Sequence, residues 1–170
     1  MVYKVKGKQN NSALCFVCGI KNKLGLRARF YACETQDGKP VLLTVIKPKK
    51  VHQSYGDRMH GGVISALLDE SIGRAIQITN PDIWAVTMDL QVKYRKPTPL
   101  GQTLYIESKI TGQNSRGFDG EGKLLLHNGT ICATATAKFF NVDISTLPDV
   151  IHESNWFYVD EKLPKVIEIG

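Results

Sequence analysis

A single stretch with helical periodicity, flanked by stretches with strand periodicity, limits the folds open to this chain of 170 residues. From Val63 to about Thr79, apolar residues recur three and four positions apart, which is the spacing of one buried helix face. A helix of about 17 residues with such a face needs a sheet to cover it. The positions on this face are Ile64, Leu67, Leu68, Ile72, Ala75 and Ile76.

The stretches around the helix alternate between apolar and polar residues, as half-buried strands do. Two of them precede the helix, at residues 24–32 and 41–46, and about four follow it between residues 83 and 140. Asn128-Gly129 predicts a two-residue hairpin turn between the last two. This order predicts an α+β fold with an antiparallel sheet of about six strands. The face expected to point inward after the helix comprises Val86, Met88, Leu90, Val92 and Tyr94.

We divide the chain into three parts. Residues 1–25 form an N-terminal arm with a cysteine loop, residues 26–142 form the main domain, and residues 143–170 form an extension that packs on the body or on a partner subunit. No apolar run approaches the roughly 20 residues that span a bilayer. The basic N-terminus lacks the apolar region of a secretory signal, so we expect a cytoplasmic protein with no membrane contact.

The net charge of +6 is compatible with an anionic partner. The lysines and arginines are scattered, however, and no aromatic-rich RNA-binding motif accompanies them. Two interpretations stay open: a solvated basic surface, or a site for a small ligand that carries several phosphates. Binding of nucleic acid is not expected.

Two of the four cysteines, Cys15 and Cys18, form a C-x-x-C pair, whereas Cys33 and Cys132 fall in predicted strands. Such a pair in a cytosolic chain indicates metal binding or redox chemistry rather than a structural disulfide. A structural zinc needs four ligands, and a thioredoxin-like motif needs a helix where this chain has a turn. The pair therefore serves local packing, or holds a zinc ion that a second subunit completes. For the functional site we predict no metal and no cofactor.

The head of the predicted helix offers free backbone N–H groups and a partial positive charge. Gly61 and Gly62 permit another molecule to approach these donors closely. Such a site can bind an anion, or polarise a carbonyl oxygen that gains charge during a reaction. The alternative is that the two glycines only allow a tight entry into the helix.

Two adjacent carboxylates, Asp69 and Glu70, interrupt the apolar run, and about 100° of rotation separates them on the helix. Glu70 has Arg74 four residues later, which predicts a helical ion pair. Asp69 has no such cation and lies among small side chains. A carboxylate in this position needs hydrogen bonds, a partner subunit or a ligand. Asp69 is therefore the better catalytic candidate.

Asp69 lies roughly 10 to 12 Å from the donors of Gly61 and Gly62 along the helix axis. This distance is too long for both groups to contact one carbonyl within a single subunit. Two helices that run antiparallel across a twofold axis would combine one head with the other carboxylate. The spacing thus predicts a composite site in a homodimer.

These motifs resemble those of a known family. His60-Gly61-Gly62 followed by VISALLDES resembles the HGG helix of hotdog-fold acyl-CoA thioesterases of the phenylacetyl-CoA thioesterase type. The segment CFVCGIKNKLGLRARF is similar to the N-terminal CxxCG signature of one branch of that family. VTMDLQVKYRKPTPLGQTLYIESKI and EGKLLLHNGTICATATAKFF resemble its later strands and closing hairpin. The resemblance covers residues 15–141.

The resemblance implies a hotdog fold and an active site at the interface of a homodimer, often within a dimer of dimers. It implies hydrolysis of an acyl-CoA thioester without a metal or redox cofactor. The family's catalytic carboxylate corresponds to Asp69, as nucleophile or as the base that activates water. The amides of Gly61 and Gly62 would polarise the thioester carbonyl. His60 would orient the loop or the carbonyl, or make only a structural hydrogen bond.

The chain departs from the family at Ser54, where some members have an asparagine that assists the site. Serine is shorter and offers no amide N–H, so either Gln53 substitutes or the reaction is slower. Ser65 either contacts the substrate or packs against the helix. We expect the phosphates of coenzyme A to meet basic residues near the sheet edge. The candidates are Arg95, Lys96 and Arg116.

Other functions stay open at this point. A non-catalytic hotdog protein could bind acyl-CoA as a sensor, but the N-terminal arm has no helix-turn-helix pattern. A hotdog dehydratase acting on acyl carrier protein would need a different layout of histidine and carboxylate. A zinc-binding or nucleic-acid-binding protein could be built on the cysteine pair. Asp69 beside an open helix face favours the thioesterase.

Overall fold

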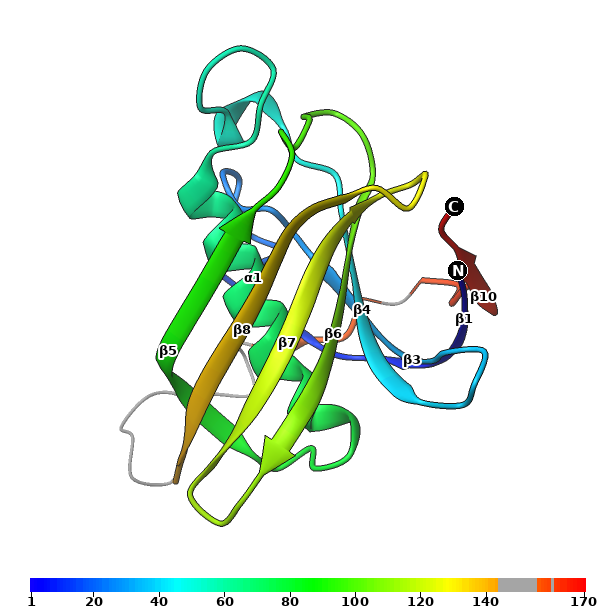
Figure 1. Ribbon diagram of the computed structural model, residues 1–170, viewed down its shortest axis with the longest axis vertical. Coiled ribbons are helices and arrows are strands. Elements are labelled where there is room, and N and C mark those ends of the chain that lie inside the picture. Colours follow the sequence, from blue (N-terminus) through cyan, green and yellow to red (C-terminus); the bar gives the residue numbers. More distant parts are fainter. Residues whose placement is uncertain (144–155, 160) are drawn as a thin grey trace.

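The computed structural model describes residues 1–143, 156–159 and 161–170 (Figure 1). Within these ranges there is one α-helix, α1 (Gly61–Ala75), and the 3-10 turns η1 (Lys50–His52) and η2 (Ile76–Ile78). The strands are β1 (Val2–Lys8), β2 (Asn11–Ser12), β3 (Arg29–Glu34), β4 (Pro40–Ile46), β5 (Trp84–Tyr94), β6 (Leu104–Gln113), β7 (Gly117–Leu126), β8 (Ile131–Val142), β9 (Trp156–Phe157) and β10 (Val166–Glu168).

Eight of these strands form one sheet in the order β10-β1-β3-β4-β6-β7-β8-β5, and every pairing in it is antiparallel. Figure 1 shows the sheet curving around α1, with β5 at one edge and β10 at the other. The predicted α+β fold with one helix wrapped by an antiparallel sheet is confirmed. The predicted turn at Asn128-Gly129 joins β7 to β8, and Gly129 has a φ of 78°, which glycine adopts without strain.

The predicted apolar face of the helix forms the core between α1 and the sheet. All six positions are buried there, and Leu67, Leu68 and Ile72 are fully excluded from solvent. The helix ends at Ala75 and η2 continues to Ile78, which is close to the predicted end near Thr79. No helix in the described part of the chain combines the length and apolar character needed to span a bilayer.

The sheet has two more strands than the predicted six, because both ends of the chain join it. β1 lies within the segment that we expected to be an arm, and β10 pairs with it. Tyr3 of β1 and Ile169 beside β10 are buried in a second apolar cluster that includes Tyr31, Leu43 and Leu125. The chain ends are therefore fixed by burial.

The C-terminal extension is described only in part, since residues 144–155 and 160 lie outside the described residues. β9 pairs with β2, so this segment contacts the body of the same chain. The Trp156 ring packs edge-on against Trp84, with 5.2 Å between ring centroids.

The inward face predicted for β5 is wrong in its first half. The pairing of β5 with β8 shifts between Thr87 and Asp89, so Met88 is an extra residue in a β-bulge. The bulge reverses the alternation before it, which leaves Val86 50% and Met88 67% exposed. Thr87 points toward α1 instead and reaches Asp69. Leu90 and Val92, after the bulge, pack against the core as predicted.

Candidate active site

The head of α1 is capped by His60, whose backbone is extended with φ −65° and ψ 136°. The His60 Nδ1 atom accepts the N–H of Gly62 at 3.0 Å, and the His60 carbonyl accepts those of Val63 and Ile64. Among the described residues no acceptor binds the N–H of Gly61. Only one of the two predicted donors, the N–H of Gly61, is therefore free. The other, the N–H of Gly62, is occupied by its bond to the capping residue His60.

Tyr94 of β5 fixes the first turn of the helix from the side. Its hydroxyl donates to the Gly61 carbonyl at 2.8 Å and lies 2.7 Å from the Ser65 hydroxyl oxygen. Ser65 also lies 3.3 Å from the Gly61 carbonyl oxygen. Ser65, predicted to contact substrate or to pack, is held at the helix head by its hydrogen bonds with Tyr94 and the Gly61 carbonyl. Sequence reasoning placed Tyr94 on a strand face and missed its contact with the helix head.

A cavity of about 350 Å³ opens at the helix head. The predicted residues Ser54, Gly61, Arg95 and Lys96 line it together, and Arg58, which was not predicted, joins them. All three charged side chains of this lining are cationic. The cavity therefore combines the free N–H of Gly61 with a positive rim, an arrangement that favours an anionic ligand.

Two other predicted residues lie apart from this cavity. Gln53 is exposed and pairs with Met59 through an isolated bridge, but it does not line the cavity. Arg116 lies in the turn between β6 and β7 and lines a different cavity, beside Met88 and Phe140. The structure thus does not bring all of the predicted residues to one place within a single chain.

Asp69 lies halfway along α1 in a second cavity, of about 360 Å³. The Thr87 hydroxyl donates a hydrogen bond to Asp69 Oδ1 at 2.8 Å. Burial raises the pKa of Asp69, the bond from Thr87 opposes that shift, and the charge of Glu70 adds to it. As predicted, no lysine, arginine or histidine in the described ranges forms an ion pair with Asp69. Its charge is therefore weakly compensated.

Glu70 lines the same cavity but has a charged partner. The Arg74 Nε atom lies 2.8 Å from Glu70 Oε1, which confirms the predicted helical ion pair. The Arg74 side chain is only 11% exposed, lies over the Phe30 ring and donates to the Asn10 carbonyl. Glu70 is thus held by a fixed cation, whereas the neighbouring Asp69 is not.

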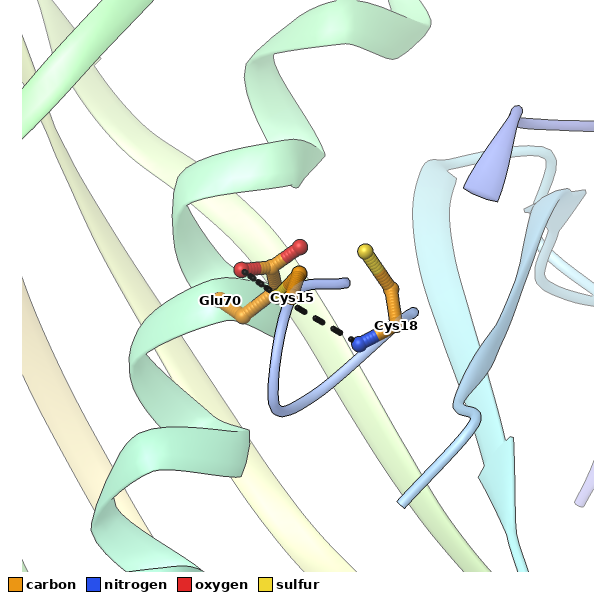
Figure 2. Close-up of side chains that lie close together, drawn as sticks. All are labelled: Cys15, Cys18 and Glu70. Atoms are coloured by element: carbon orange, nitrogen blue, oxygen red, sulfur yellow. Dashed lines mark hydrogen bonds between the residues drawn. The ribbon is translucent and has the colours of Figure 1, made fainter. Parts of the chain in front are cut away.

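The cysteine pair lies against Glu70, as Figure 2 shows. The Cys15 Sγ atom is 3.7 Å from Glu70 Oε2 and accepts backbone N–H bonds from Val17 and Cys18. The interaction with the Cys18 side chain is the main cause that lowers the pKa of the Cys15 thiol to about 6. The same interaction between the two thiol groups, together with burial, raises the pKa of the Cys18 thiol. All four cysteines are free thiols.

The donor and the carboxylate are separated within one chain. Gly61 and Asp69 are eight residues apart on α1, about 12 Å along its axis at 1.5 Å per residue. Their two cavities share no lining residue. The separation predicted from the sequence is therefore present in the structure.

Comparison with known proteins gives a sequence match over part of the chain. The model of the Thioesterase superfamily matches residues 56–133, which include α1 and the strands from β5 through β7. The match does not reach the cysteine pair. None of the curated proteins is significantly similar to the chain.

Solved structures share the fold over 58% to 74% of this chain. A thioesterase superfamily protein is 24% identical with a TM-score of 0.62, covering 74% of this chain, which spans only 62% of that protein. A Bacillus halodurans protein solved with CoA is 28% identical over 58% of this chain and 70% of its own, with a TM-score of 0.54. The Escherichia coli PaaI protein, from the phenylacetic acid degradation operon, is 14% identical over 69% of this chain and 81% of its own, with a TM-score of 0.61. The fold is the hotdog fold of thioesterases.

Proposed function

We propose that this protein hydrolyses acyl-CoA thioesters, with Asp69 as the catalytic carboxylate. The observation that carries the proposal is the position of Asp69 in a cavity, with one hydrogen bond from Thr87 and, among the described residues, no ion pair to its carboxylate. The Thioesterase superfamily match and the likeness to a structure that contains CoA support it. We further infer the phenylacetyl-CoA thioesterase type, in the branch with an N-terminal CxxCG signature.

The proposed site is composite and needs a homodimer. β5 is a long edge strand with Val86 and Met88 exposed, and an open apolar edge of this kind favours pairing with another strand. Two β5 strands paired across a twofold axis would place two copies of α1 antiparallel. The head of one helix would then approach Asp69 of the other. A dimer of such dimers would contain the same sites.

In the proposed reaction the thioester oxygen accepts the N–H of Gly61 from one chain. The carboxylate of Asp69 from the other chain removes a proton from a water molecule, whose oxygen attacks the carbonyl carbon. The negative charge that develops on the carbonyl oxygen is stabilised by the Gly61 donor and the helix dipole. Collapse of the intermediate breaks the carbon–sulfur bond and releases the acid and the CoA thiolate, which takes up the proton.

A second form of the reaction uses Asp69 as the nucleophile. Its carboxylate would attack the thioester carbon directly, expel the CoA thiolate and leave a mixed anhydride that water then hydrolyses. A single turnover in water labelled with oxygen-18 separates the two forms. Label enters Asp69 in the nucleophilic form when water attacks its carboxyl carbon, whereas in the general-base form label enters only the released acid.

The remaining head residues would bind the CoA portion of the substrate. Arg58, Arg95 and Lys96 are exposed cations on the rim of the head cavity, where they would contact phosphate groups. Ser54 lines this cavity, and its backbone N–H donates to the Arg58 carbonyl at 2.9 Å. His60 would keep the Gly61 N–H directed outward by capping the next amide.

The test is release of CoA thiol from a panel of acyl-CoAs that differ in chain length and aromaticity. Wild type should turn over at least one of them, and Asp69→Asn should lose about 10²-fold to 10⁴-fold in kcat. Asp37→Asn, in the exposed turn between β3 and β4, is the matched control and should keep wild-type activity. Binding of acyl-CoA without turnover would identify a sensor and contradict the proposal, as would full activity of Asp69→Asn.

A further inference from the structure

Three side chains outside the proposed reaction form a cluster with the composition of a zinc site. Cys15 and Cys18 come from the loop between β2 and β3, and Glu70 comes from α1 (Figure 2). The two Sγ atoms and a carboxylate oxygen of Glu70 all lie within 4.8 Å of one another. Thiolate and carboxylate are both common zinc ligands. The cluster therefore brings three ligands together within one chain.

The spacing of the cluster is close to that of a tetrahedral site. Zinc bonds of about 2.3 Å to sulfur and about 2.0 to 2.2 Å to oxygen place neighbouring ligand atoms about 3.5 to 3.8 Å apart. The Cys15 Sγ atom and Glu70 Oε2 are 3.7 Å apart. The other pairs of ligand atoms lie within 4.8 Å of each other, so binding would bring them closer by up to about 1 Å.

The backbone around the cysteines is already arranged for a thiolate. The N–H groups of Val17 and Cys18 donate to Cys15 Sγ at 3.3 and 3.4 Å, and the N–H of Gly19 donates to the Cys15 carbonyl at 2.8 Å. A Cβ atom at Gly19 would lie 2.4 Å from that carbonyl oxygen, so the turn requires glycine. The tight turn holds both sulfur atoms on the side that faces Glu70.

Arg74 positions two of the three ligands without covering them. It binds Glu70 through Oε1 and leaves Oε2 facing Cys15. Its Nη2 atom lies 3.3 Å from Cys18 Sγ. Partners that orient ligands in this way are a regular part of metal sites. Arg74 thus acts as an outer support for the cluster.

The charges of the cluster also call for a divalent cation. On binding a metal, both cysteine thiols would lose their protons, so the bound ligands would be two thiolates and the carboxylate of Glu70, with Arg74 as the one positive charge beside them. The net charge of this ligand set is −2, which a divalent ion neutralises. Sulfur ligands favour zinc over magnesium or calcium, and an iron–sulfur cluster would need more cysteines.

We propose that Cys15, Cys18 and Glu70 of a single chain bind one Zn²⁺ ion. The three ligands line the cavity that contains Asp69, so the fourth position of the metal faces that cavity and takes water. The ion would tie the N-terminal loop to α1 at the residue next to Asp69. The sequence alone left open local packing or a zinc shared by two subunits, whereas in the structure Glu70 lies where it can supply a third ligand within one chain.

The test is zinc stoichiometry by elemental mass spectrometry on reduced protein purified without chelators and re-equilibrated with Zn²⁺. Wild type should retain one zinc per chain, and Cys15→Ser, Cys18→Ser and Glu70→Gln should each lose it on gel filtration. Cys132→Ser and Asp37→Asn are matched controls that should keep the metal. No zinc, one zinc per two chains, retention by Glu70→Gln, or selection of copper or iron would each overturn the proposal.

A second measurement uses only the wild-type chain and does not depend on how the variants fold. Zn²⁺ should slow alkylation of Cys15 and Cys18 by a maleimide, and a chelator should restore it, as read by peptide mass spectrometry. Cys33 and Cys132 serve as internal controls whose labelling should not respond to the metal. Equal labelling of Cys15 with and without Zn²⁺ would overturn the proposal.

Discussion

The two cavities along α1 differ in almost every chemical respect. The head cavity has the free N–H of Gly61 and a rim of Arg58, Arg95 and Lys96, and its lining has no carboxylate. The cavity in the middle of the helix has Asp69 and a largely apolar wall that includes Ile83 and Phe139. The head cavity can polarise a carbonyl group or bind an anion. In the second cavity the carboxylate of Asp69 can accept a proton or act as a nucleophile.

This difference shows why one chain is insufficient for the proposed reaction. A thioester carbonyl in the head cavity meets the Gly61 N–H but no carboxylate, and a carbonyl beside Asp69 meets a carboxylate but not the helix-head N–H. The two functions lie about 12 Å apart on one rigid helix, so side-chain motion does not join them. Each cavity supplies what the other lacks, which is the arrangement expected if two chains share each site.

After Asp69→Asn, removing the donor at the head should have the largest effect on the reaction. Gly61→Pro deletes one N–H and keeps the first turn, because proline is favoured at the first helical position and the extended backbone of His60 is suited to precede it. We expect kcat to fall about 10²-fold to 10³-fold, the range for loss of one oxyanion donor.

Gly61→Ala is the control for that change, since it keeps the N–H. Its Cβ atom would approach the Tyr94 hydroxyl no closer than 3.5 Å, an ordinary contact. Alanine should therefore retain most of the activity. Equal loss in Gly61→Ala and Gly61→Pro would show that space at the helix head matters and that the donor does not.

The pH profile tests the surroundings of Asp69. Burial raises the pKa of this carboxyl above its ordinary value, so its basic form is lost at a higher pH than for an exposed aspartate. Activity should fall as the pH decreases through that raised pKa. Thr87→Val removes the hydrogen bond that lowers the pKa of Asp69, so the acid limb should move to still higher pH.

The control is Thr136→Val, the same substitution at an exposed position of β8, which should not shift the acid limb of the pH profile. The limb is measured as kcat/KM against pH with one substrate from the panel. A limb that stays fixed in Thr87→Val, or that moves to lower pH, would argue against Asp69 as the titrating group.

The cations of the head rim should contribute the smallest effects. Arg58→Gln and Lys96→Gln should each raise KM for acyl-CoA by up to about fivefold, because exposed charge pairs contribute at most about 1 kcal/mol. kcat should not change, and the effect should shrink as salt is added. Lys39→Gln, in the turn between β3 and β4, is the matched control. A change in kcat alone would place these cations elsewhere in the mechanism.

The fold was predictable to the extent that side-chain periodicity reports burial. The buried face of α1, the antiparallel sheet and the turn at Asn128-Gly129 all follow from local patterns. The β-bulge at Met88 does not, because it depends on how β5 pairs with β8. In β1, Tyr3 and Val5 alternate with lysines as in a strand. The many lysines nevertheless favoured the interpretation of this segment as a solvent-exposed arm.

The parts of the site that depend only on the spacing of residues along α1 were predictable. The ion pair of Glu70 with Arg74 and the absence of a helical cation beside Asp69 both follow from spacing. The cap by His60 and the contacts of Thr87 and Tyr94 required the three-dimensional structure, since they join the helix to its own loop and to β5.

A mixed dimer tests the shared site most directly. Asp69→Asn and Gly61→Pro chains, each with a different tag, are expressed together, and dimers that carry both tags are purified. One of the two sites in such a dimer combines an intact head with an intact Asp69, so we predict about half of the wild-type activity from two nearly inactive parents. Activity no higher than that of the parent dimers would contradict a site built from two chains.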